Sequence, residues 1–358
     1  MGMTLVFRER EVSLAHILIL PLLAVGAAFL AGSLLMIWAN VDPLVGYASF
    51  LSGSIGGYVQ IADTLLRTTP FLLMAVGIAF SNRSGVLNVG AEGQYLMGAI
   101  ATTATALHLQ SIGINPAVVL IISVIAGAIA GALWASIAGF MKAYFEINEI
   151  VVTVIMNWLA LRIMQWLLRG PLKNPLSQMW PMSPPIDVKL PIILPGTRLH
   201  AGFILALSIA LLTYYILFMT KTGFMVRVLG SNPHAAKYAG FPVKKLIVFS
   251  LAYSGALAGL AGGIEVLGVF HFLYEGIAVG LGYTSIVASL LGRNHPIGVI
   301  GSSLIFGMIY NGTVYLQAAT GLTYTFSKAI EGLIYIFFML FTILMLYEVK
   351  LVIKREGS

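Results

Sequence analysis

Residues 116–141 read PAVVLIISVIAGAIAGALWASIAGFM, a run without a single charged side chain. A helix needs about 20 apolar residues to cross the hydrocarbon core of a bilayer. This run is long enough to span a membrane as one helix. The first hypothesis for the fold is therefore an integral membrane protein.

The composition of the whole chain supports the same hypothesis. Of 358 residues, 59% are hydrophobic and only 9% are charged, and the mean hydropathy is +0.95. Because soluble domains carry about 25% charged residues, this chain could not cover a globular surface in water. The composition excludes free cytosolic enzymes and nucleic-acid regulators. The absence of cysteine excludes disulfides, thiolate zinc sites and iron–sulfur clusters.

Further apolar runs lie on both sides of the first one. Together they predict an all-α fold, a polytopic membrane helix bundle of about ten transmembrane helices with short or broken helices. Two runs, 68–81 and 279–292, are short and precede polar stretches with glycine, a pattern typical of half-helices beside a transport path. An ordinary short span with a tight loop explains each of them equally well. The expected spans are 14–40, 68–81, 91–110, 116–141, 149–168, 201–219, 246–270, 279–292, 297–318 and 328–348.

Glycine spacing supports close packing of the predicted helices. Gly127 and Gly131 are four residues apart on one predicted helix, and Gly255, Gly259 and Gly263 have the same spacing on another. Small residues at this spacing share a helix face and let neighbouring backbones approach. The pattern favours a compact bundle and says nothing about function.

The distribution of basic residues predicts the orientation in the membrane. With the N-terminus inside, most of the 20 Lys and Arg residues fall on the cytoplasmic side, and the C-terminus is inside as well. The span at 14–40 is expected to be an uncleaved anchor in the cell (plasma) membrane, because it extends beyond a usual signal-peptide core. Two segments outside the bilayer stand out. Residues 169–200 are external and rich in proline, and residues 220–245 are cytoplasmic and basic.

The chain carries no motif for covalent chemistry. It contains no G-x-x-x-x-G-K-[ST] phosphate loop and no G-x-S-x-G hydrolase elbow, and its six histidines show no H-x-x-x-H spacing. We therefore expect no enzyme activity, no catalytic residue and no metal site in this chain.

Polar residues at the ends of apolar runs are the candidates for a solute path. Ionisable groups inside a membrane are costly, so each requires a partner or a function. A structural role is an alternative for several of them: Glu92 could favour a helix start, and Asn148 could be an N-cap. For Glu265 and Glu331, snorkelling or a pair with Arg162 or Lys328 would suffice. The path candidates are Asn88, Glu92, Gln94, Asn148, Glu149 and Asn157.

The basic loop at 220–245 predicts a short helix apart from the spans. Asn232 is a plausible N-cap, Pro233 suits the first helical position, and Gly240 is a typical C-terminal stop. Alanines at 235 and 236 favour the helix between them. A capped helix of about two turns suits docking of a soluble partner, although a plain linker is the simpler alternative.

Several stretches together resemble a known family. They are Ser84–Gln94, Phe145–Ile150 with Asn157, Gly223–Gly240, Ser254–Gly259 and Ala288–Gly298, spread over about 65–345. In this order they resemble the permease subunit of ATP-binding-cassette (ABC) importers, in the branch of ribose, branched-chain amino-acid and nucleoside permeases. The form of Gly85–Gln94 and the external segment are most similar to nucleoside permeases that work with a basic-membrane-protein-type binding lipoprotein.

The resemblance implies a function and partners. The whole chain, 1–358, would be a single transmembrane permease domain that imports nucleosides by alternating access. It would work with a second homologous permease chain, cytoplasmic ATPase subunits that bind ATP and Mg, and an external solute-binding lipoprotein, with no cofactor of its own and no nucleic acid. The alternatives are an ABC permease for sugars or branched-chain amino acids, and an ion-gradient-driven secondary transporter. The residues implied in ATPase coupling are Gly230, Asn232, Ala235, Ala236 and Gly240.

Overall fold

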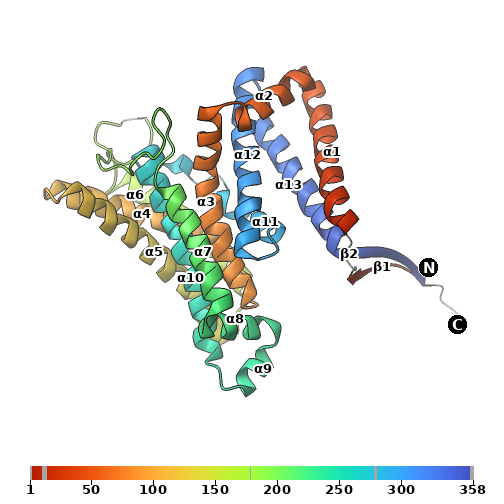
Figure 1. Ribbon diagram of the computed structural model, residues 1–358. Coiled ribbons are helices and arrows are strands. Elements are labelled where there is room, and N and C mark those ends of the chain that lie inside the picture. The colour runs from red at the N-terminus through yellow and green to blue at the C-terminus, as the bar shows by residue number, and fades with distance from the viewer. Residues whose placement is uncertain (1, 10–13, 178, 278–279, 355–358) are drawn as a thin grey trace. The chain divides into compact units, whose positions relative to one another are not determined.

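The computed structural model describes residues 2–9, 14–177, 179–277 and 280–354. It is built almost entirely of helices (Figure 1), which confirms the predicted fold class in its coarse form. The chain divides into two compact units. One comprises Met1–Gly56 with Ile309–Ser358, and the other comprises Gly57–Met308.

The first unit contains both ends of the chain. Its helices α1 (Leu14–Trp38) and α13 (Tyr324–Leu346) pack on each other, and α2 (Pro43–Ile55) begins at Asp42, whose side chain accepts a hydrogen bond from the Leu44 N–H. Strands β1 (Gly2–Glu9) and β2 (Tyr347–Lys354) pair antiparallel, from Gly2 opposite Lys354 to Glu9 opposite Tyr347. This ribbon, next to the two terminal helices, was not predicted from the sequence.

The second unit holds most of the helices. Its long members are α3 (Tyr58–Arg83), α4 (Ala91–Ser111), α5 (Pro116–Phe145), α6 (Glu149–Arg169), α7 (Gly202–Met219), α10 (Val243–Glu265) and the beginning of α12 (Pro296–Thr320). Its short members are α8 (Lys221–Ser231), α9 (Pro233–Tyr238), the π-helix η1 (Val266–Phe270), the 3₁₀-helix η2 (Glu275–Ile277) and α11 (Leu281–Leu291).

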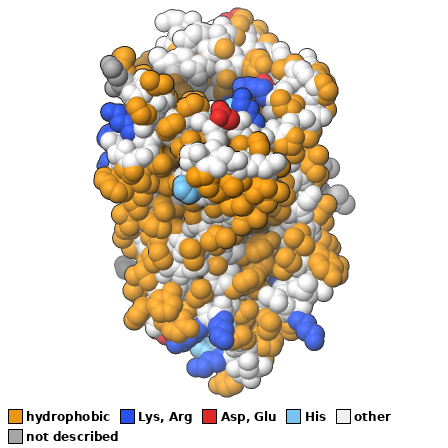
Figure 2. Space-filling view, turned by 90° about the vertical axis from the view of Figure 1, so that its left-hand side faces the viewer, with side chains coloured by type: hydrophobic (Ala, Val, Ile, Leu, Met, Phe, Trp, Pro, Cys, Tyr) orange, Lys and Arg blue, Asp and Glu red, His pale blue; other side chains and the backbone are white. Residues whose placement is uncertain are grey.

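The helices of this unit differ in what covers them. In the most apolar part of α3, 89% of the residues are buried inside the protein. In the corresponding parts of α5 and α7, only 22% and 28% are buried. α5 is also the most hydrophobic of these three helices. Its exposed face carries, at four-residue spacing, Ile121, Ile125, Ile129 and Leu133. An exposed apolar stripe of this kind suits contact with lipid. Figure 2 shows a broad band of hydrophobic side chains across one face, with Lys and Arg near its lower edge.

The close backbone approach that the glycine spacing predicts is found where α4, α5 and α10 meet. A Cβ placed on Gly131 would lie 2.2 Å from the Gly255 carbonyl oxygen, and one on Gly259 would lie 2.3 Å from the Gly127 carbonyl oxygen. A Cβ on Gly98 would lie 2.2 Å from the Gly259 carbonyl oxygen. The backbones of these three helices therefore touch, which only glycine permits.

Within the described part of the chain, six helices are long and apolar enough to cross a membrane: α3, α5, α6, α7, α10 continued by η1, and α12. This number does not confirm the expected total of about ten. The expected spans 14–40 and 328–348 correspond to α1 and α13. The side chains at 14–25, 338 and 341–346 of these two helices are not among those that the structure describes. The first residue of the expected span 279–292 lies outside it too.

The expectation of a short span at 68–81 is wrong. Helix α3 begins ten residues earlier, at Tyr58, and is 26 residues long. Hydropathy alone missed its first turns because they carry Asp63, Thr64 and Arg67, polar residues that the rest of the unit buries or pairs. The expectation of a short helix at 279–292 is met by α11, which has 11 residues.

Candidate functional site

The loop between α3 and α4 is held by two side-chain amides. Asn88 Nδ2 donates to Gln94 Oε1 at 2.8 Å, and Gln94 Nε2 donates back to Asn88 Oδ1 at 2.9 Å. The same Nδ2 donates to Ser254 Oγ on α10 at 2.7 Å, and Oδ1 accepts from the Gly90 N–H. Both amides are buried, so they fasten the loop to α4 and α10.

Glu92, in the first turn of α4, binds the beginning of α11. Its Oε1 accepts from the Gly280 N–H at 2.9 Å and its Oε2 from the Gly282 N–H at 2.6 Å. Gly280 has φ of 83°, and a Cβ on Gly282 would lie 2.3 Å from the Glu92 nitrogen. One carboxylate therefore lies at the N-termini of two helices whose backbones touch, where both macrodipoles favour a negative charge.

Asn157 on α6 joins the same region. Its Oδ1 accepts from the Gly93 N–H at 2.8 Å, while its Nδ2 donates to the Val89 carbonyl at 2.9 Å and to Tyr283 Oη at 3.0 Å. Asn157 is buried, whereas Tyr283 on α11 is 42% exposed. The side chain thus connects the loop, α4, α6 and α11.

Four of the six predicted path residues therefore meet in one hydrogen-bonded cluster around the start of α4. We call it the α4–α11 cluster; its members are Asn88, Glu92, Gln94, Asn157, Ser254, Gly280, Gly282 and Tyr283. Sequence analysis did not select Ser254, Gly280 or Gly282. A hydroxyl and two backbone N–H groups give no signal in a single sequence, because their role depends on the side chain opposite them.

Asn148 and Glu149 lie at the start of α6, outside this cluster. Asn148 Oδ1 accepts from the Ile150 N–H at 2.9 Å, so it is the N-cap of α6, the structural alternative given above. Glu149 forms an ion pair with Lys142 at 2.9 Å and accepts from the Leu87 N–H at 3.4 Å. Its role is to fasten the end of α5 and the α3–α4 loop to α6.

The other intramembrane acids have partners on neighbouring turns or helices. Glu331 pairs with Lys328 at 2.8 Å, as expected. Glu265 pairs with Arg67 at 3.4 Å, not with Arg162, whose guanidinium donates to Gln165. Arg67 precedes the apolar run at 68–81, so hydropathy alone gives no sign that it belongs to the same helix.

The short helix in the basic loop forms as predicted. In α9 the Asn232 side chain accepts from the N–H groups of His234 and Ala235, both at 3.0 Å, and Gly240 has φ of 76°. Ala236 is fully buried against α8 and α10, in a cluster that includes Leu229 and Leu246. Tyr238, by contrast, is 93% exposed. A partner would therefore meet Tyr238, while Ala236 anchors the helix.

Helix α8 connects α9 to the end of α3 by backbone contact. A Cβ on Gly230 would lie 2.2 Å from the Arg83 carbonyl oxygen, and one on Gly85 would lie 3.2 Å from Gly230 Cα. Arg83 Nε in turn donates to the Asn294 carbonyl at 2.8 Å, in the turn that follows α11. Arg293 and Asn294 both have positive φ, 57° and 49°. The turn is thus a tight one that Arg83 holds in place.

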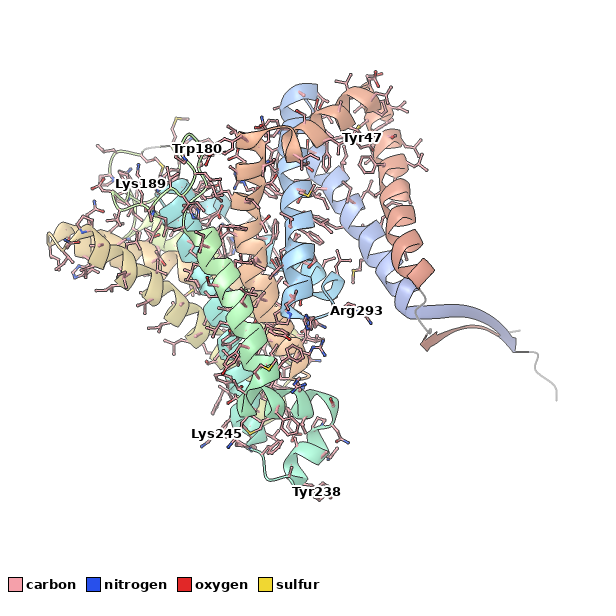
Figure 3. All side chains as sticks on the ribbon, in the orientation of Figure 1. Tyr47, Trp180, Lys189, Tyr238, Lys245 and Arg293 are labelled. Carbon is pink, nitrogen blue, oxygen red and sulfur yellow. The ribbon has the colours of Figure 1, made fainter. Side chains whose placement is uncertain are left out.

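The proline-rich segment at 169–200 runs along the chain that follows α10. The N–H groups of Ser183, Ile186 and Leu190 donate to the carbonyls of Leu273, His271 and Leu267, at 2.8, 2.8 and 3.1 Å. No residue of the described part of 170–200 is helical, which agrees with its high proline content. Figure 3 places Trp180 and Lys189 of this segment at one end of the unit, and Tyr238 and Lys245 at the other.

His200 closes this segment in a buried position. Its Nδ1 accepts from the Gly202 N–H at 3.1 Å, and a Cβ on Gly268 would lie 2.3 Å from its Nε2. Burial lowers the pKa of His200 to about 4, and the nearby His271 contributes to the same direction. The imidazole is therefore neutral at pH 7.

No cluster of three or more His, Asp or Glu residues suited to a metal ion is found within the described residues. The α4–α11 cluster offers amides, one carboxylate and hydroxyls, all engaged with one another or with backbone. Such an arrangement positions helices and provides no nucleophile beside a base.

Comparison with known proteins identifies relatives over most of the chain. Residues 60–345 match the family described as branched-chain amino acid transport system / permease component. The guanosine ABC transporter permease protein NupP of Bacillus subtilis is 33% identical over 86% of this chain and 88% of its own length. The glucose ABC transporter permease protein TsgB13 of Haloferax volcanii is 29% identical over 94% of this chain and 91% of its own. The nucleoside ABC transporter permease protein NupB of Lactococcus lactis is 27% identical, over 82% and 83%.

Proposed function

Because this chain belongs to the family of branched-chain amino acid transport system permease components, a family of multi-pass membrane proteins, we propose that it is the permease subunit of an ATP-driven ABC importer that takes up nucleosides. Two of the relatives above are named as guanosine and nucleoside permeases, which supports a nucleoside as the solute. The relative named as a glucose permease makes a sugar the second candidate.

The observation that carries the proposal is a continuous set of contacts between α9 and α11. Ala236 packs α9 on α8, Gly230 brings α8 against the Arg83 carbonyl, and Arg83 holds the turn after α11 through Asn294. The other end of α11 is bound by Glu92 and, through Tyr283, by Asn157. A movement of α9 is thus passed to a short helix held at both ends.

This arrangement supports transport by alternating access. Helix α11 has only 11 residues, and polar contacts at its two ends set its position. When ATP closes the ATPase dimer, α9 is displaced, and α11 shifts relative to α4 and α6. The α4–α11 cluster holds α11 in one of its two positions. In this position the solute path is closed at the cluster.

The remaining parts of the transporter are separate chains. ATP and Mg bind to cytoplasmic ATPase subunits, which meet α9 near Tyr238, and this chain performs no covalent chemistry. A second homologous permease chain completes the path, and an external solute-binding lipoprotein docks on residues 169–200. The whole chain is one permease domain in the cell membrane, with both termini in the cytoplasm. The opposite placement of residues 169–200 and α9 within their unit supports this topology.

A gradient-driven carrier is the competing class. Such a carrier uses deep acidic groups that bind and release ions. Here Glu265 is paired with Arg67, and Glu92 accepts two backbone N–H groups, so both acids already have structural partners. These pairings favour the ATP-driven importer.

Co-purification and uptake test the proposal together. The chain is isolated in mild detergent from its native membrane, the co-purifying proteins are identified, and uptake of labelled guanosine and glucose is measured in cells with and without the chain. We expect an ATPase in comparable amount and guanosine uptake that needs ATP. Active transport by the isolated chain, driven by an ion gradient, would refute the proposal, and uptake of glucose alone would change the solute.

A further inference from the structure

Three arginines and a histidine gather where α3, α7 and α11 end. Arg83 is the last residue of α3, Arg227 lies on α8, and Arg293 and His295 lie in the turn between α11 and α12. The positive charges of Arg227 and Arg293 both act on Arg83, and that of Arg83 acts on His295. We call this group the basic cluster; Figure 3 labels its exposed member, Arg293.

Among the residues that the structure describes, no acidic group balances the charge of the basic cluster. None of its three arginines is within ion-pair distance of an Asp or Glu in the part of the chain that the structure describes. Arg83 donates to the carbonyls of Asn294 and Arg293, which are neutral acceptors. Arg227 Nε is buried and has no hydrogen-bond partner among the described residues. Because like charges repel, a bound anion would stabilise the basic cluster.

Aromatic rings place the cluster beside a lipid-facing helix. The Arg227 guanidinium lies 5.1 Å from the centre of the Phe218 ring, and the His295 ring lies 5.0 Å from the same ring and 5.6 Å from Tyr214. Phe218 and Tyr214 belong to the last turns of α7, a helix that also exposes Leu211, Leu212, Tyr215 and Met219. Because α7 is apolar up to Met219 and is followed by Lys221, these rings lie at the depth where a bilayer changes from acyl chains to headgroups.

From this juxtaposition we infer that the basic cluster is a binding site for the phosphate group of an anionic phospholipid, whose acyl chains lie along α7. Guanidinium groups bind phosphate through several directed N–H donors, and basic pockets between membrane helices bind anionic headgroups. The assignment of the lipid to the cytoplasmic leaflet rests on the proposed topology. The assignment of the basic cluster as its binding site does not depend on that topology. Arg83 also holds the turn after α11, so a lipid in this site would brace the contact between α8 and that turn.

Lipid retention is the direct test. The full chain, with the subunits that co-purify with it, is placed in nanodiscs of phosphatidylcholine alone or with added phosphatidylglycerol, and retained phosphatidylglycerol is counted by native mass spectrometry. Arg227→Gln and Arg293→Gln each remove one charge. Neither arginine side chain donates a hydrogen bond to another described residue, so neither substitution breaks one. Each should weaken phosphatidylglycerol retention about fivefold, as expected for the loss of one basic residue at an anionic surface. Lys244→Gln, which removes a charge that rests on Tyr144, is the matched control and should change retention little.

Three outcomes would overturn the inference. Equal retention by the wild type, Arg227→Gln and Lys244→Gln would show that the cluster does not select the lipid. Protection of the wild type against thermal unfolding by inorganic phosphate in pure phosphatidylcholine, to the same degree as by phosphatidylglycerol, would identify free phosphate as the ligand. Loss of the ATPase subunit from Arg227→Gln with unchanged lipid retention would assign the cluster to a protein partner. Because retention is read without transport, failure of this inference leaves the proposed function standing.

Discussion

The carboxylate of Glu92 accepts a hydrogen bond from the Gly282 N–H at 2.6 Å, and the two residues open different helices, α4 and α11. One side chain thus fixes the mutual position of two helix N-termini. The contact leaves no room for a side chain at position 282, because a Cβ on Gly282 would lie 2.7 Å from Glu92 Cα.

Replacing Glu92 by Gln should impair transport. The amide keeps the shape but loses the charge and one of its two acceptor oxygens, and a hydrogen bond to a charged group contributes about 1.5–3 kcal/mol. We expect guanosine uptake to fall at least about tenfold at unchanged protein level. Glu146→Gln, at an exposed position, removes the same charge and should leave uptake near the wild-type rate. Normal uptake by Glu92→Gln would exclude it from the transport machinery.

Asn157 should matter more than its partner Tyr283. Asn157→Ala leaves the Gly93 N–H and the Val89 carbonyl without the bonds that they make to it, at a cost of about 1–3 kcal/mol for each buried group. Tyr283→Phe removes only the hydroxyl, from a residue that is partly exposed. Uptake and thermal unfolding are measured for both single variants and for the double variant, as a double-mutant cycle. We expect the losses of uptake and of stability to be non-additive. Purely additive losses would show that the two side chains act independently.

A substitution at Gly255 should destabilise the bundle. A Cβ there would lie 2.4 Å from both the Gly131 carbonyl oxygen and Ala135 Cβ, and the backbone of a neighbouring helix cannot move aside cheaply. For Gly255→Ala we expect a loss of about 1–3 kcal/mol, seen as a lower Tm of the purified protein. Gly301→Ala is the control, since a Cβ at Gly301 meets nothing within 4 Å, and it should leave Tm unchanged or slightly raised. Equal effects of the two substitutions would contradict the packing that the structure shows.

Proline at position 236 should uncouple the ATPase from transport. The Ala236 N–H donates to the Asn232 carbonyl at 3.0 Å, and its side chain is fully buried, so Ala236→Pro breaks α9 and its packing together. We expect stimulated ATPase activity of the assembled transporter to be lost while the amount of chain in the membrane is kept. Tyr238→Ala changes only the exposed tip, and it should weaken ATPase co-purification without altering Tm. Full transport by Ala236→Pro would refute the role of α9 in coupling.

Acidification should loosen the external segment through His200. Its pKa is about 4 in the folded protein, because of burial and the nearby His271, against an ordinary 6.5. The unfolded state therefore binds the proton more readily, so stability is complete above about pH 6.5 and is lost as the pH falls toward 4. The Tm of the wild type should decline over this range, and His200→Asn should flatten the decline. His234→Asn, on the exposed α9, serves as the control and should keep the wild-type profile.

Local signals predicted a good part of this molecule. Asn148 and Asn232 cap the helices that follow them, and Gly240 takes the positive φ of a helix stop, because each of these roles depends on a few adjacent residues. Close packing at Gly131 and Gly255 was also indicated, since small residues four apart share a helix face, but the sequence did not show that these two glycines meet. The start of α3 was missed because Asp63 and Arg67 look like loop residues until Arg198 and Glu265 are seen beside them.

The sequence by itself determined that the chain is a membrane helix bundle with a capped helix in its basic loop, because hydropathy, length and capping act over neighbouring residues. Only the tertiary structure decided what the polar residues do. Glu92 meets Gly280 and Gly282 across 188 and 190 positions of the chain, and Arg83 meets Asn294 across 211. Such contacts form when buried carboxylates, amides and guanidinium groups find partners among the groups that folding brings to them, and no local pattern encodes which groups those are.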